Sequence, residues 1–131
     1  MKILKLIVGL ALVISCGSCK DAAATDIHTV TPAEMQNHLK YDDNVQVVDV
    51  QPEEEYQKSH LLNARNIIYD KDFRKKLDKL DKSRPVALYC TTGKVSPEAA
   101  QILKDAGFLH IYVLEGGIKK WRDDTSENGK K

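Results

Sequence analysis

Apolar residues occur along this chain in short runs with two different spacings. Runs rich in β-branched residues predict buried strands, whereas apolar positions three or four residues apart predict amphipathic helices. Strands are expected at residues 27–30, 45–50, 66–69, 85–89 and 111–114. Helices are expected between or after them, at residues 32–39, 52–56, 70–80, 97–106 and 118–121. Because strands alternate with helices, the pattern indicates a mostly parallel sheet that is covered by helices on both faces.

Two of these helices begin with N-terminal signals. Thr31 precedes Pro32 and Glu34 in the order of a capping box with proline in the first helical turn. Ser96 and Pro97 repeat the pattern of an N-cap followed by proline at the first helical position. The second signal matters for chemistry, because the strand at residues 85–89 leads into Cys90 only a few residues earlier.

Residues 1–15 have a different pattern from the rest of the chain. Lys2 and Lys5 form a short basic region, and the run from Leu6 to Ile14 is apolar apart from one glycine. A helix needs about 20 apolar residues to cross a bilayer, and this run is much shorter. It is typical of a cleaved secretory signal rather than of a membrane-spanning helix.

Residues 13–16, Val-Ile-Ser-Cys, resemble the lipobox of bacterial lipoprotein signals. The resemblance implies that Cys16 becomes the lipid-modified first residue of the mature chain, and that lipid alone holds the protein at a membrane. Cys19 is a weaker alternative because the upstream aliphatic position is missing, and a plain secretory signal is a second alternative. The implied location is the periplasm or cell envelope. Gly17, rather than an acidic residue, follows the cysteine, which favours the outer membrane.

These patterns divide the chain into four parts. Residues 1–15 are expected to be a signal peptide, 16–26 a lipidated N-terminus and tether, 27–122 one folded domain, and 123–131 a polar tail. Removal of residues 1–15 takes two of the 20 basic side chains and no acidic one, so the formal net charge changes from +1 to −1. Acidic and basic residues alternate between positions 70 and 82, which is typical of a solvated helix and gives no indication of nucleic-acid binding.

Cys90 is the candidate reactive residue. Small or polar residues separate it from the next helix, namely Thr91, Thr92, Gly93, Lys94, Val95 and Ser96. Backbone N–H groups of such a loop can converge on the sulfur, and the positive end of the following helix points at the same place. Both features favour the thiolate, which is the nucleophilic form of cysteine. The alternative is an inert buried cysteine. No cluster of Cys and His has metal-ligand spacing, so neither a metal nor another cofactor is expected.

Three blocks of the sequence, taken in order, resemble one known family. Residues 47–67 are similar to the family's Asp-Val-Arg, Glu-Tyr, Gly-His-Ile and Ala-x-Asn-Ile signature. Residues 88–96 resemble its strand and active-site loop, and residues 107–121 resemble its Gly-Phe, Leu-x-Gly-Gly and Trp ending. On these blocks the chain is identified as a member of the single-domain rhodanese-like family over nearly all of residues 27–122. The resemblance implies a three-layer α/β fold with a mostly parallel five-stranded sheet between helices. It also implies that Cys90 accepts sulfane sulfur as a persulfide and passes it to a nucleophile.

The sequence departs from the family pattern at positions close to the expected site. Gln51 replaces the usual arginine after Asp-Val, and Val95 stands where many single-domain members have an arginine in the active-site loop. Lys94 is the only positively charged residue of the loop, and lysine lacks the two-pronged fit of a guanidinium to oxyanions. We therefore expect weaker recognition of thiosulfate, or a natural donor that carries less charge.

The resemblance also implies roles for other residues. Asp49 and His60 could form an acid–base pair, but in the family they are scaffold residues that tie the first helix and its neighbouring loop to the sheet. Glu55 is expected to brace the helix surface or a loop rather than to act as a general acid. For Thr91 and Thr92 two interpretations stay open. Their hydroxyls donate hydrogen bonds to a bound oxyanion, or they are only small polar residues of the loop.

The function implied by the resemblance is a cell-envelope sulfurtransferase. It would move sulfane sulfur from thiosulfate or a persulfide donor, through a Cys90 persulfide, to a thiol or cyanide acceptor. A thioredoxin-like protein is the candidate reductant that keeps Cys90 reduced. The alternative from a different class is a non-catalytic rhodanese-like module that binds a partner or senses redox state. A cysteine phosphatase of related architecture is not expected, because its Cys-x5-Arg loop needs an arginine where this chain has Ser96.

Overall fold

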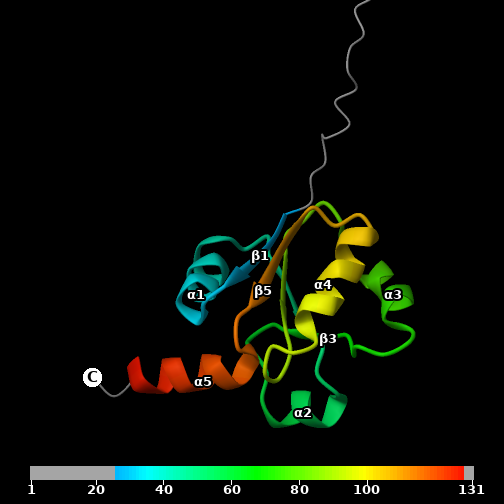
Figure 1. Ribbon diagram of the computed structural model, residues 1–131. Helices are drawn as coiled ribbons and strands as arrows, with labels where there is room; N and C mark the ends of the chain where they lie inside the picture. Colours follow the sequence, from blue (N-terminus) through cyan, green and yellow to red (C-terminus); the bar gives the residue numbers. More distant parts are fainter. Residues whose placement is uncertain (1–25, 129–131) are drawn as a thin grey trace, which may run out of the picture.

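The computed structural model describes residues 26–128, and Figure 1 shows them as a central sheet with helices on both sides. The predicted signal peptide at residues 1–15 and the predicted lipidation of Cys16 lie outside the described residues. The same holds for the rest of the tether up to residue 25 and for residues 129–131.

The sheet has five strands in the order β1-β5-β4-β2-β3. Their bounds are Asp26–Val30 for β1, Gln46–Asp49 for β2, Arg65–Asn66 for β3, Val86–Tyr89 for β4 and His110–Leu114 for β5. Every strand pair is parallel, so the expected mostly parallel sheet is confirmed and is parallel throughout. The central strand β4 is completely buried, as a strand covered by helices on both faces must be.

Helices cover both faces of the sheet (Figure 1). On one face lie α1 (Pro32–Tyr41) and α5 (Gly117–Asn128). On the other lie α4 (Ser96–Asp105), α3 (Phe73–Lys76) and the 3-10 turn η2 (Leu77–Lys79). The short helix α2 (Glu53–Lys58) follows β2 and lies near the carboxyl ends of the strands, at the lower edge of Figure 1.

The two faces of the sheet carry separate apolar cores. On one face Leu88 of β4 belongs to the same buried cluster as Leu103 of α4. On the other face the next residue, Tyr89, belongs to a cluster with Ile118 of α5. Successive residues of a strand point to opposite faces, so one central strand fixes both helical layers. Cys90 follows directly and is part of the first cluster, which places its side chain under the helix that begins after the loop.

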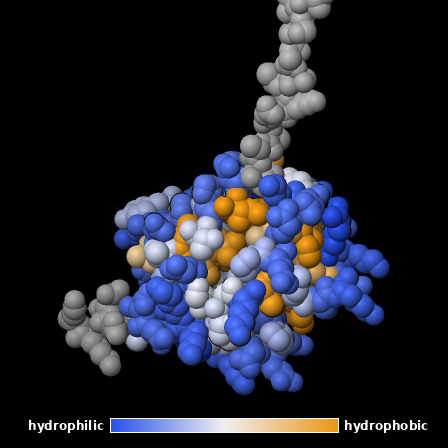
Figure 2. All heavy atoms as spheres, viewed as in Figure 1, coloured by the Kyte–Doolittle hydropathy of each residue, from blue (hydrophilic) through white to orange (hydrophobic). Residues whose placement is uncertain are grey.

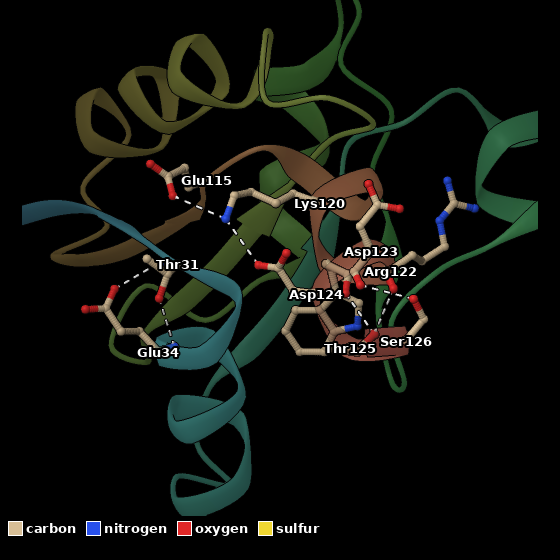
Figure 3. A network of polar contacts seen from close by, with 10 residues as sticks. Thr31, Glu34, Glu115, Lys120, Arg122, Asp123, Asp124, Thr125 and Ser126 are labelled. Atoms are coloured by element: carbon tan, nitrogen blue, oxygen red, sulfur yellow. Dashed lines mark hydrogen bonds and ion pairs between the residues drawn. The ribbon is translucent and has the colours of Figure 1, made fainter. Parts of the chain in front are cut away.

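The capping box predicted at the first helix is confirmed. Thr31 Oγ1 accepts a hydrogen bond from the backbone N–H of Glu34 at 3.2 Å, and Glu34 Oε2 accepts one from the N–H of Thr31 at 2.8 Å (Figure 3). Pro32 lies in the first turn, as predicted. Because these contacts are local in sequence, the start of α1 is fixed directly after β1.

The continuous helix predicted over residues 70–80 is wrong. Regular helix begins only at Phe73 and gives way to the 3-10 turn at Leu77. Asp70 Oδ1 accepts a hydrogen bond from the N–H of Asp72 at 2.9 Å, and such local side-chain contacts compete with helical hydrogen bonds. The apolar residues predicted to face the core, Phe73, Leu77 and Leu80, are buried nevertheless.

The last helix is longer than expected. α5 continues past Trp121 to Asn128, so residues 123–128 of the expected tail are helical. Lys120 Nζ lies 3.1 Å from Asp124 Oδ2 one turn later, and the Thr125 hydroxyl donates to the Trp121 carbonyl at 2.8 Å (Figure 3). The ion pair joins side chains four positions apart, and such pairs support a polar helix. The Thr125 contact satisfies its hydroxyl within the helix and adds no comparable support.

The surface is mainly polar. Figure 2 shows hydrophilic side chains over most of the visible face, with apolar side chains gathered between them near its centre. Within residues 26–128, no helix combines the length and the apolar character needed to cross a membrane.

Candidate active site around Cys90

Cys90 lies where the central strand β4 reaches the carboxyl edge of the sheet. In the sheet order β4 stands between β5 and β2, so the ends of three strands surround this position. In open α/β sheets the carboxyl edge is where ligands bind. Cys90 is 3% exposed, so the loop that follows encloses the residue instead of presenting it on the surface.

Two groups of the loop contact the sulfur. The backbone N–H of Gly93 donates to Cys90 Sγ at 3.0 Å, and Ser96 Oγ lies 3.3 Å from the same atom. Gly93 has φ +89°, and a Cβ there would lie 3.1 Å from the backbone nitrogen of Gly116. Glycine is therefore required at this turn, because a side chain would be strained and would crowd the start of α5. The predicted convergence of loop groups on the thiol is present for this amide and this hydroxyl.

The predicted N-cap role of Ser96 is wrong. Helix α4 begins at Ser96 itself, Val95 is the N-cap residue, and no side chain caps this end. The Ser96 hydroxyl is completely buried and contacts the sulfur of Cys90 instead. A hydroxyl can rotate its proton, so it accepts from the thiol and can donate to a thiolate. The helix runs in the expected direction. α4 starts at the end of the loop, with its positive N-terminal end toward Cys90.

The start of α5 fixes the other side of the loop. The N–H groups of Ile118 and Lys119 donate to the carbonyl oxygens of Cys90 at 2.9 Å and Thr91 at 3.1 Å. Gly117 has φ +66°, and a Cβ at this position would lie 2.6 Å from both carbonyl oxygens. The helix can approach the loop this closely only because the residue is glycine. The Gly116-Gly117 pair carried the resemblance in sequence, but its contact with the loop was not predicted.

A buried hydrogen-bond network lies beside the loop. The Asp49 carboxylate is completely buried and accepts from the backbone N–H of Gln51 at 2.7 Å and from Gln51 Nε2 at 2.8 Å. The Thr91 hydroxyl donates to Gln51 Oε1 at 2.9 Å. Burial, followed by the hydrogen bond to Asp49, raises the pKa of Tyr89 well above its usual value. The Tyr89 phenol oxygen also accepts from the backbone N–H of Leu61 at 2.9 Å. Sequence reasoning identified Asp49 and Thr91 but treated Gln51 only as a departure from the family pattern.

The other predicted residues lie outside this network. His60 is exposed, its ring stacks on Tyr56 at 4.0 Å, and its Nδ1 lies 2.8 Å from the Tyr56 carbonyl oxygen. Glu55 pairs with Lys58 at 3.1 Å on the surface of α2. Asp49 takes Gln51 as its side-chain partner, and no contact among the described residues joins it to His60. These positions agree with bracing roles and do not form an acid–base pair.

Lys94 is the one positively charged residue within the loop itself, residues 90–96. Lys94 and Thr92 are exposed, and Lys94 makes no ion pair with any residue in the described part of the chain. Val95, at the position where many family members have an arginine, is partly buried and packs against the core. Residues 26–126 contain no group of three His, Cys, Asp or Glu side chains placed to hold a metal ion.

A separate cavity of about 560 Å³ lies away from this site, and no residue of the Cys90 loop lines it. It is bordered by side chains from α1, α5 and the segments around β2, among them Leu39, Val45, Leu62, Arg84 and Trp121. The sequence pattern did not indicate this cavity.

Comparisons with known proteins identify the class to which this site belongs. The chain matches the Rhodanese-like domain family over residues 31–124. It is 33% identical over 79 residues to the thiosulfate sulfurtransferase GlpE of Coxiella burnetii, a match that covers 60% of this chain and 73% of that protein. The chain therefore belongs to the rhodanese-like domain family, and the predicted family is confirmed.

Two further relatives agree with this assignment. The chain is 38% identical over 76 residues to the uncharacterized protein YqhL of Bacillus subtilis, covering 58% of this chain and 60% of that protein, which is less than two thirds of the relative. The crystal structure of a rhodanese-related protein from Thermoplasma volcanium is 27% identical with a TM-score of 0.66, and the match covers 74% of this chain and 92% of that one. The predicted three-layer α/β fold is confirmed by this likeness. At the level of the family, the relatives named as sulfurtransferases support sulfur transfer as the chemistry.

Proposed function

We propose that this protein is a cell-envelope sulfurtransferase that carries sulfane sulfur on Cys90. The observation that supports the proposal is the pair of hydrogen-bonding groups at the sulfur, the Gly93 N–H at 3.0 Å and the Ser96 hydroxyl at 3.3 Å. Both groups can donate a hydrogen bond to a negatively charged sulfur, whether this is the Cys90 thiolate or the terminal sulfur of a Cys90 persulfide. An inert core cysteine has no need of such a loop.

The reaction consists of two displacements at sulfur. The Cys90 thiolate attacks the outer sulfur of the donor, the sulfur–sulfur bond of the donor breaks, and sulfite or a thiolate leaves with the bonding electrons. Cys90 then holds the transferred atom as a persulfide. A thiolate or cyanide acceptor attacks the terminal sulfur, and the Cys90 thiolate is released again. No external oxidant or reductant is needed in the cycle.

The charge around the loop favours a donor with less charge than thiosulfate. The arginine position of many family members is Val95 here, packed on the core, and the lysine beside it is exposed. An exposed ammonium group is strongly hydrated and binds an oxyanion less tightly than a guanidinium fork. We therefore propose an organic persulfide as the donor, a thiol as the physiological acceptor, and a thioredoxin-like protein as the reductant of Cys90. The proposed location is the periplasmic side of the outer membrane, with Cys16 as the lipid anchor, and it rests on residues 1–19 of the sequence.

The test is the intact mass of the protein after incubation with thiosulfate or with glutathione persulfide. We expect a mass increase of one sulfur atom that maps to the peptide containing Cys90, and loss of this increase when cyanide is added. Cys90→Ser is the control, because a hydroxyl cannot carry sulfane sulfur. A folded wild-type protein that takes up no sulfur from either donor would contradict the proposal and support a binding or redox-sensing module.

A further inference from the structure

Gln51 connects the buried acid of the site to the loop that carries the reactive cysteine. We propose that Gln51 is a positioning residue for Cys90, acting through the side chain of Thr91. The inference rests on the proposed function, in which Cys90 is the sulfur carrier. It assigns to Gln51 a task that an arginine at the same position could not perform in the same way.

The sheet register brings the two residues together. Asp49 of β2 is paired with Tyr89 of β4, so the chain positions two residues further on, Gln51 and Thr91, leave the sheet side by side. Thr91 Oγ1 and Gln51 Oε1 lie 2.9 Å apart, although the residues are 40 positions apart in sequence. Because Thr91 follows Cys90 directly, this contact fixes the loop at the residue next to the nucleophile.

The orientation of the Gln51 amide is determined by its partners. Its Nε2 lies 2.8 Å from Asp49 Oδ2 and 3.2 Å from the Ser59 carbonyl oxygen, and both partners are acceptors. The nitrogen must therefore donate to them, and Oε1 must face Thr91. An amide oxygen only accepts, so the Thr91 hydroxyl is the donor in this contact. Gln51 is 2% exposed, so its amide is shielded from bulk solvent.

An arginine would give a different arrangement. A guanidinium has only donors, so it could pair with Asp49 but could not accept the Thr91 proton. The Thr91 hydroxyl would then be free to donate to a ligand. In this chain the proton is already committed to Gln51, so of the two interpretations left open by the sequence, the structure favours a fixed loop residue over an oxyanion donor. Glutamine in place of the family's arginine at position 51 thus holds the loop and also removes one hydrogen-bond donor for anions. This agrees with a sulfur donor of low charge.

The test uses two variants that affect the contact from opposite sides. Thr91→Val removes the donor without touching Asp49, and Thr91→Ser keeps the hydroxyl. Gln51→Met removes both amide groups at similar volume. In the full-length protein, kcat and KM for glutathione persulfide are measured, together with the pH profile of iodoacetamide alkylation, read by mass spectrometry on the Cys90 peptide. Thr29→Val is the matched control, because Thr29 is an exposed residue of β1 far along the chain from the loop.

We expect Thr91→Val to lower kcat/KM about threefold to tenfold, mainly through kcat, and to move the alkylation profile to higher pH. Thr91→Ser should restore both properties. The double variant Gln51→Met/Thr91→Val should be no worse than the more impaired single variant, because residues that act through one contact are not additive. Additive losses, or a Thr91→Val protein with unchanged kcat and alkylation, would overturn the inference. Should Gln51→Met fail to fold, the comparison of Thr91→Val with Thr91→Ser decides the matter alone. A wild-type protein without sulfur transfer would overturn the proposed function, whereas the alkylation profiles would still test the positioning role.

Discussion

The sulfur of Cys90 and the hydroxyl oxygen of Ser96 lie 3.3 Å apart at the two ends of one loop, and both residues are buried. A hydroxyl that contacts a buried sulfur stabilises the thiolate more than the thiol, because hydrogen bonds to charged groups are the stronger ones. The position that a related phosphatase would fill with an arginine therefore holds a neutral donor suited to sulfur.

The first prediction concerns this hydroxyl. Ser96→Ala should slow sulfur transfer and the reaction of Cys90 with iodoacetamide at neutral pH by about tenfold, because a hydrogen bond to a charged group contributes roughly 1.5–3 kcal/mol. The measurements are kcat/KM and the alkylation rate of the Cys90 peptide at one fixed pH. Ser96→Thr, which keeps the hydroxyl, serves as the control. Unchanged rates in Ser96→Ala would mean that the hydroxyl does not act on the reactive sulfur.

Local patterns predicted the parts of the fold that depend on neighbours in sequence. The capping box of Thr31 and Glu34, the strand that ends at Tyr89 and the glycine turn after Cys90 all follow from spacings of a few residues. The contact of Gln51 with Thr91 could not be predicted in this way, because it depends on the register between β2 and β4. The sequence pattern at Ser96 satisfied the rule for an N-cap, but the nearby sulfur of Cys90 took the hydroxyl and the helix began without a side-chain cap.

The second prediction concerns the approach of α5 to the loop. Gly117→Ala should lower the free energy of unfolding by about 1–3 kcal/mol and abolish most sulfur transfer. A Cβ at this position would lie 2.6 Å from the carbonyl oxygens of Cys90 and Thr91, so the loop must move. Gly107→Ala is a matched control. Gly107 also has positive φ, +102°, but its Cβ would meet only the Lys82 side chain at 3.7 Å. Urea unfolding and kcat/KM should show loss of stability in both variants and loss of activity in Gly117→Ala alone.

The third prediction concerns stability at alkaline pH. The folded protein holds the Tyr89 pKa above its usual value, mainly through burial and then through Asp49. The stabilising effect is complete below the unfolded pKa of about 10 and is lost as the pH rises through the folded value. Tyr89→Phe should therefore unfold more easily at neutral pH, by about 1–3 kcal/mol, because the Leu61 N–H and Asp49 lose a buried partner. Above pH 10 its disadvantage should shrink. A constant difference between the two proteins from pH 7 to 11 in urea unfolding would contradict this account.

The fourth prediction concerns the anchor. If Cys16 is acylated, Cys16→Ser should release the protein into the soluble fraction or leave its signal peptide uncleaved, because in this proposal the lipid is what holds the protein at the membrane. Cell fractionation and intact mass would measure both effects. Cys19→Ser is the matched control and should stay in the membrane fraction with a lipid-sized mass increase. Normal maturation and membrane attachment of the Cys16→Ser protein would exclude the lipoprotein interpretation.

The fifth prediction concerns charge at the loop and the choice of donor. Lys94 is exposed, so Lys94→Ala should lower kcat/KM for thiosulfate by no more than about fivefold, which is the effect expected of a solvated ion pair. The loss should shrink as salt is added. Val95→Arg should raise kcat/KM for thiosulfate by about tenfold to a hundredfold, because a guanidinium can bind the oxyanion with two charge-assisted hydrogen bonds. Neither change should alter the use of an alkyl persulfide without carboxylate groups by more than about twofold.

Two controls separate this charge effect from damage to the fold. Lys104→Ala removes a comparable exposed lysine near the other end of α4, and it should leave kcat/KM for both sulfur donors unchanged. Val95 packs on the core, so the thermal midpoint of Val95→Arg has to be measured beside its activity. If Val95→Arg stays folded and both loop variants use thiosulfate as the wild type does, the charge of the loop does not select the donor. If the variants change kcat/KM for the two sulfur donors in parallel, they act on the Cys90 chemistry and not on recognition of the oxyanion.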